Sequence, residues 1–169
     1  MHAILTLNTA AKIRTAEEVD RCISAQLPDE ETEKELFELV TKHHIHGPNC
    51  RTNPHAMCKD PKGLCRWNYP KAYNPTTRIT EEGRVYCARP DNGRSTPVMV
   101  RNALVPATNK DVAPYCPRLL LKFRCHVYVD LVQDHMAVKY LYNTGMFRTQ
   151  CGRSLVAFCG WAVGKAGTF

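Results

Sequence analysis

The chain has 169 residues, of which 44% are apolar, and its 23 Lys/Arg against 16 Asp/Glu give a formal net charge of +7. It contains no apolar run of the roughly 18 residues that a membrane span requires, and no basic stretch followed by an apolar signal segment. Without a secretory signal, nine cysteines are more typical of free thiols or metal ligands than of disulfides. Composition therefore excludes membrane-spanning and secreted proteins, and it predicts an intracellular protein, nuclear or cytoplasmic, with no membrane partner.

The charge is unevenly distributed along the chain. Residues 1–40 carry four Lys/Arg against nine Asp/Glu, whereas residues 41–169 carry nineteen against seven. A long basic stretch favours a polyanionic partner, and nucleic acid is the first candidate. A basic surface with no such partner has the same composition, so charge alone leaves both interpretations open.

The N-terminal quarter predicts one strand and two helices. Thr15 and Glu18 have the Thr-x-x-Glu spacing of a capping box, and Pro28 is expected to end the helix that they begin. The second helix has an apolar side formed by Leu36, Phe37, Leu39 and Val40. The expected elements are a strand over 2–7, a helix over 15–27 and a helix over about 30–43.

Residues 44–117 are rich in proline and show no sustained hydrophobic period. Short strands are expected at Arg84–Cys87 and Pro97–Val100, on either side of the Asn92-Gly93 turn. A stretch of this length without periodicity needs another source of order. We therefore treat it as a loop-rich insertion.

A metal is one candidate for that source of order. The spacing His46-x3-Cys50-x7-Cys58-x6-Cys65 offers one imidazole and three thiolates to a tetrahedral zinc ion. With all four positions filled, such a zinc would be structural. His44 is an alternative to His46, and a loop with unrelated free cysteines is the alternative to the metal site.

Basic and aromatic residues alternate directly after this cluster, from Arg66 to Tyr73. Aromatic rings that stack on bases beside cations that contact phosphates use this combination, although a loop packed on the core would look similar. The candidate nucleic-acid-binding residues are Arg66, Trp67, Lys71, Lys122 and Arg124.

Residues 125–142 predict a strand, a turn and a helix. From Cys125 to Leu131 apolar and polar residues alternate, which is typical of a half-buried strand. Asp134 can cap the helix that carries Tyr140. A positioned tyrosine can attack a phosphodiester, but an aromatic residue more commonly serves packing. His126 faces away from the apolar side of the strand and is expected to be either structural or a residue that supports the site from behind, rather than a metal ligand.

Several ordered blocks of the sequence share one resemblance. The blocks are HAILTL (2–7), KIRTAEEVD (12–20), LVTKHHIHGP (39–48), Cys58, Cys65, YPK (69–71), VAPY (112–115), CHV (125–127) and AVKYLY (137–142). Together they resemble the replication-initiator portion of Helitron transposases, the Helitron helicase-like region. The resemblance covers about five-sixths of the chain and ends at Tyr142.

The resemblance implies a rolling-circle endonuclease that acts on single-stranded DNA. Such enzymes hold Mg²⁺ or Mn²⁺ through a His-hydrophobic-His pair, and a helix tyrosine attacks the scissile phosphate. His2 matches one histidine of the pair. Tyr140, preceded by Lys139, matches the nucleophile. Members of the family usually continue into a helicase domain, which a chain of this length does not contain.

The chain departs from the family pattern at the residues that carry the chemistry. Ile4 stands where the second histidine is expected, and Thr144 stands where the second tyrosine is expected. We therefore expect a catalytically defective fragment in residues 1–142, followed by an unrelated tail over 143–169 that a frameshift would explain. The alternatives are a zinc-stabilised nucleic-acid-binding module without catalysis and a non-functional transposon remnant.

The predicted fold class is α+β. We expect a partial antiparallel sheet with helices packed on one face and the Cys/His insertion over residues 44–117.

Overall fold

The computed structural model of the chain describes residues 2–7, 11–47, 50, 53–81, 83–100, 103–132 and 154–159. The helices and strands follow one another as β1 (His2–Thr6), α1 (Ala16–Cys22), α2 (Lys34–His43), β2 (Arg78–Ile79), β3 (Val85–Tyr86), β4 (Ser95–Val100), β5 (Ala103–Thr108), α4 (Pro117–Phe123), β6 (Val127–Val132) and β7 (Ser154–Cys159).

The predicted α+β class is confirmed. The antiparallel pairing that we expected occurs in two small sheets, β2 with β3 and β4 with β5. The three-stranded sheet differs, because β1 and β6 both pair in parallel with β7 in the order β1-β7-β6. β7 lies in the tail that was expected to be unrelated to the domain, so its pairing could not be included in the predicted sheet.

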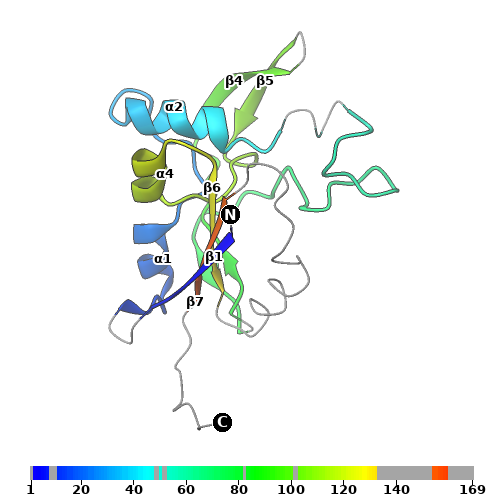
Figure 1. Cartoon of the computed structure of the whole chain (residues 1–169). Coiled ribbons are helices and arrows are strands. Elements are labelled where there is room, and N and C mark those ends of the chain that lie inside the picture. The colour runs from blue at the N-terminus through cyan, green and yellow to red at the C-terminus, as the bar shows by residue number, and fades with distance from the viewer. Residues whose placement is uncertain are drawn as a thin grey trace.

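The helices α1, α2 and α4 lie on one side of the three-stranded sheet, as predicted (Figure 1). The side chains of β6 alternate, with Val127, Val129 and Leu131 buried and Tyr128 and Asp130 half-buried. This is the predicted strand, beginning two residues later than expected. Its apolar face packs against two buried residues, Val19 in α1 and Ile23 directly after α1.

A second apolar cluster joins α2 and α4. Its buried residues are Leu27, Leu36, Leu39, Val40, Val112, Tyr115 and Leu120. The apolar side of α2 was predicted correctly, with Phe37 only half-buried. Helix α4 was not predicted; Pro117 stands in its first turn, where a missing N–H costs nothing.

Both N-terminal helices are shorter than the sequence pattern suggested. The Thr15–Glu18 capping box forms as predicted, but α1 ends at Cys22 rather than near Leu27. The backbone of Ser24 exchanges hydrogen bonds with Tyr115, which draws the chain into an extended path. Helix α2 begins at Lys34 because the carboxylate of Asp29 accepts backbone N–H groups in the preceding turn.

The short strands of the insertion exist but pair with partners other than each other. β3 pairs with β2, and β4 forms a hairpin with β5. Among the described residues, no helix is long and apolar enough to cross a membrane.

Candidate metal centre

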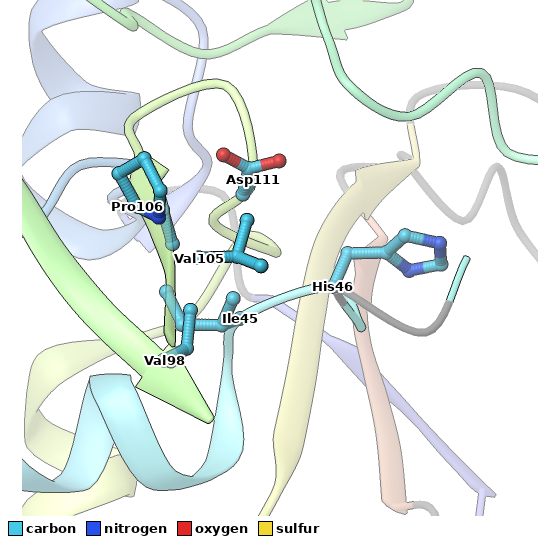
Figure 2. Close-up of a pocket in the computed structure, with 7 residues that line it drawn as sticks. Ile45, His46, Val98, Val105, Pro106 and Asp111 are labelled. Atoms are coloured by element: carbon cyan, nitrogen blue, oxygen red, sulfur yellow. The ribbon is translucent and has the colours of Figure 1, made fainter. Parts of the chain in front are cut away.

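The short segment after α2 places the side chains of Ile45 and His46 on different sides of the chain. The backbone of this segment is held by a bridge between Ile45 and Val112 and by the His46 N–H, which donates to the Asp111 carbonyl at 2.7 Å. Ile45 packs beside Val98 on the β4–β5 hairpin, whereas the His46 imidazole points away from the hairpin (Figure 2). His46 therefore faces the loop that carries Cys50, Cys58 and Cys65, called the cysteine-rich loop below.

The cysteine-rich loop folds into consecutive turns that return Cys65 to Cys58. The Cys50 N–H donates to the Gly47 carbonyl at 2.7 Å, and the Arg66 N–H donates to the Cys58 carbonyl at 2.8 Å. A tight turn from Asp60 to Leu64 closes the hairpin. There the Asp60 carboxylate accepts the N–H groups of Lys62 and Leu64 at 2.9 and 2.8 Å.

These turns bring the four predicted ligand residues together. One ligand atom from each of His46, Cys50, Cys58 and Cys65 lies within 4.8 Å of the others. The Cys65 Sγ atom is 3.4 Å from Nε2 of His46. Cys50 and Cys58 are buried, and the other two residues are half-buried. The cluster can hold a metal ion through one nitrogen and three sulfur atoms.

The thiols influence one another because they are close and partly desolvated. Burial and the neighbouring Cys58 and Cys65 thiols raise the pKa of Cys50 to about 12. Burial also acts to raise the pKa of Cys65, but backbone N–H groups of Tyr69 and Trp67 lower it overall. Three adjacent thiolates repel one another, so a bound cation would stabilise the deprotonated cluster.

Aromatic rings fix the orientation of His46. Tyr69 stacks on the imidazole with 4.0 Å between ring centroids, and Trp67 meets it edge-on at 5.8 Å. Lys71 and the buried Arg89 lie over the Tyr69 ring at 5.0 and 6.0 Å. The sequence placed Tyr69 in the basic aromatic stretch but gave no sign that its ring stacks on His46.

The structure distinguishes between the two histidines that the spacing left open. The His44 side chain is fully buried, and its Nε2 accepts the Val127 N–H at 3.3 Å. Burial, followed by nearby His126, lowers the pKa of His44 to about 3. His44 stacks on His126 and packs against Tyr115. His44 is a core residue, and His46 is the histidine whose ring lies in the cysteine cluster.

His126 has the structural place that we expected. Its Nδ1 lies 2.6 Å from the His43 carbonyl oxygen, and its ring stacks on His44 at 4.7 Å. The imidazole thus links the C-terminal end of α2 to the start of β6.

The candidate nucleic-acid-binding residues lie in two separate places. Arg66 is exposed, and the Trp67 side chain is 47% exposed beside the metal cluster. Lys122 lies over the Phe123 ring on α4, and Arg124 forms an ion pair with Glu35 of α2. Figure 1 shows α4 on the opposite side of the sheet from the cysteine-rich loop. Only the first group, with Lys71, adjoins the metal centre.

Of the residues predicted to carry the cleavage chemistry, only His2 lies in the described part of the chain. Tyr140 and Lys139 lie outside the described part of the chain. The backbone of His2, at the start of β1, is in register with Leu155 of β7, and Ile4 is in register with Ala157.

A polar cluster that the sequence did not single out lies on the other face of β6. The Tyr128 hydroxyl donates to the Asp130 carboxylate at 3.4 Å. Burial raises the pKa of Asp130 to about 6, and hydrogen bonds from the Leu131 N–H and the Tyr128 hydroxyl, with the Lys71 charge, only partly offset this. The alternation of Tyr128 and Asp130 with apolar residues was the signal that could have identified this face.

The seven cysteines at positions 22, 50, 58, 65, 87, 116 and 125 are free, which agrees with the expectation of thiols or metal ligands. No protein-family model matches the chain, and no curated protein matches it.

Proposed function

We propose that the chain is a zinc-stabilised, single-stranded-DNA-binding portion of a Helitron-type rolling-circle transposase that does not cut DNA. The observation that carries the proposal is the His46, Cys50, Cys58 and Cys65 cluster, because it holds the loop on which Arg66 and Trp67 lie.

Zinc suits the donor set and the spacing of the ligand atoms. Zn–S distances of about 2.3 Å and Zn–N distances of about 2.1 Å place tetrahedral ligand atoms roughly 3.5–3.8 Å apart. The Cys65–His46 separation of 3.4 Å is close to this range, and pairs as far apart as the 4.8 Å limit need to approach by only about 1 Å. Four protein ligands leave no position for a reacting water, so the ion would stabilise the loop rather than catalyse a reaction.

The residues around the cluster support single-stranded DNA as the partner. Trp67 offers an exposed ring for base stacking, while Arg66 and Lys71 supply positive charge for phosphates. The excess of Lys/Arg after residue 40 adds a general attraction for a polyanion.

The absence of cleavage rests on the sequence. A divalent Mg²⁺ or Mn²⁺ ion prefers several ligands, and Ile4 removes one imidazole of the His-hydrophobic-His pair that the resemblance implies. Thr144 removes the second tyrosine. Binding without strand transfer is therefore the proposed activity.

The test uses a fluorescently labelled single strand of about 20 nucleotides and the zinc-loaded full chain. Anisotropy should show binding that weakens steeply between about 50 and 200 mM salt and with little preference for sequence. Removal of zinc by a chelator should abolish it. A salt-insensitive interaction, or unchanged affinity without zinc, would refute the proposal.

The same DNA incubated with Mg²⁺ or Mn²⁺ tests the second half of the proposal. We expect no covalent protein–DNA adduct on a denaturing gel. An adduct that disappears in Tyr140→Phe would show that the chain retains the nuclease chemistry.

A further inference from the structure

The loop that carries Cys58 and Cys65 also carries large apolar side chains that contribute nothing to the core. Met57 is 91% exposed in the turn between Ala56 and Lys59, and Leu64 is 65% exposed at the end of the Asp60 turn. The loop extends away from the helix layer (Figure 1). Both side chains lie on the stretch between Cys50 and Cys65, so a metal ion in the cluster would hold them in a fixed place for a partner.

The same loop is positively charged. Between residues 56 and 73 there are four cationic side chains, Lys59, Lys62, Arg66 and Lys71, against the single carboxylate of Asp60. That carboxylate accepts two backbone N–H groups of its own turn. The charge therefore favours a polyanion as the occupant of the surface.

Binding of a flexible single strand gives the exposed side chains of Met57 and Leu64 no role. Aromatic rings and cations are sufficient to bind a flexible single strand. Aliphatic side chains of this size are used differently, since they enter a base step and separate stacked bases where the duplex is bent or interrupted. Such a step is most accessible where a duplex ends and a single strand begins.

We propose that this loop recognises the junction between duplex and single-stranded DNA. Met57 and Leu64 enter the terminal base step, while Arg66 and Trp67 contact the adjoining single strand. This inference rests on the proposed function and specifies the DNA structure that the same site prefers.

The β4–β5 hairpin provides a matched control within the chain. Met99 and Leu104 are paired across the two strands and are 66% and 64% exposed. Neither strand, 95–100 or 103–108, contains a lysine or arginine. A double substitution there removes a similar apolar area without affecting the cationic loop.

The experiment compares a forked DNA with its single strand and with a blunt duplex. The full zinc-loaded chain is titrated into each, with 2-aminopurine at the first paired position of the fork. Wild type should bind the fork about tenfold more tightly than the single strand, and 2-aminopurine fluorescence should rise as the base unstacks. The Met57→Ser/Leu64→Ser variant should lose both effects and keep its affinity for the single strand. Met99→Ser/Leu104→Ser should behave as wild type.

The outcomes separate this inference from the proposed function. Equal affinity for fork and single strand, or an unchanged preference in Met57→Ser/Leu64→Ser, overturns the junction and leaves single-strand binding standing. Failure to bind the single strand overturns both. Vesicles of phosphatidylserine provide a further arm, because basic loops with apolar tips also bind anionic membranes. Vesicle binding that depends on Met57 and Leu64, without a preference for the fork, overturns the inference as well.

Discussion

Replacing Arg89 with methionine removes a buried guanidinium that connects three segments of the backbone. The side chain is 6% exposed, and its Nη1 lies 2.6 Å from the carbonyl oxygens of Asn109 and Val112 and 3.3 Å from that of Ala25. A buried carbonyl left without its donor costs about 1–3 kcal/mol. Methionine also removes the cost of burying the guanidinium charge, which offsets part of this loss. We therefore expect the free energy of unfolding to fall by about 2–4 kcal/mol.

Arg94→Met is the matched control. Arg94 also reaches the backbone of the same N-terminal segment, at the Leu27 carbonyl, and it pairs with Asp29 at 2.8 Å. Its side chain is 45% exposed and that of Asp29 is 36% exposed. A surface ion pair of this kind contributes less than about 1 kcal/mol.

The assay is urea unfolding of the zinc-loaded chain, followed by far-ultraviolet circular dichroism, together with zinc competition against a chelator. Because Arg89 supports Tyr69, which stacks on His46, we also expect Arg89→Met to weaken zinc binding by about tenfold or more. Equal destabilisation by Arg89→Met and Arg94→Met would refute the argument from buried carbonyls. Unchanged zinc affinity would refute the link to the metal centre.

Trp67→Ala should weaken single-strand binding by about 1–3 kcal/mol, the contribution of one stacked base, and anisotropy titration measures it. Arg66→Gln should reduce the slope of log affinity against log salt by about 0.7, whereas Arg124→Gln should leave it unchanged because Arg124 already pairs with Glu35; equal slopes in the two variants would contradict this assignment. Asp130 has a raised pKa in the folded chain, so its contribution to stability is present below its ordinary pKa near 3.8 and is lost as pH rises through about 6. Thermal melting should therefore show Asp130→Asn more stable than wild type at pH 7, with the difference shrinking toward pH 5; a variant that gains nothing at pH 7 would show that the carboxyl group is not desolvated.

Local patterns predicted the elements whose ends are determined by their own residues. The Thr15–Glu18 capping box and the alternation along β6 depend on neighbours in sequence, and both are observed. The end of α1 was wrong because its cause is distant. Ser24 pairs with Tyr115, and no periodicity within residues 15–27 reveals that partner.

The cluster was predictable because one histidine and three cysteines, the residue types that bind zinc, lie close together in the sequence between residues 46 and 65. The choice between His44 and His46 was not, because residues two apart face the same side of a regular strand. Here His44 ends α2 and turns into the core, so only the tertiary structure shows which histidine faces the cysteines. That direction is set by the bridge between Ile45 and Val112, far apart in sequence. The stacking of Tyr69 on His46 likewise follows from tertiary structure alone.

The pairing of β1 and β6 with β7 lay beyond the sequence argument for a different reason. Residues after Tyr142 carry no family resemblance, so β7 was not expected to join the sheet. Antiparallel pairing was assumed for the central strands, and only the register of β7 with both neighbours reveals parallel order.

Cobalt substitution tests the zinc-stabilised loop most directly. The full chain is purified, its metal content is determined, and the metal is exchanged for Co²⁺, whose absorption reports both thiolate ligation and tetrahedral geometry. We predict one zinc per chain and a tetrahedral cobalt–thiolate spectrum, both lost in Cys58→Ser and retained in Cys125→Ser, because Cys125 is exposed and lies outside the cluster. A metal-free chain, or a Cys58→Ser variant with the metal content and spectrum of wild type, would contradict the account.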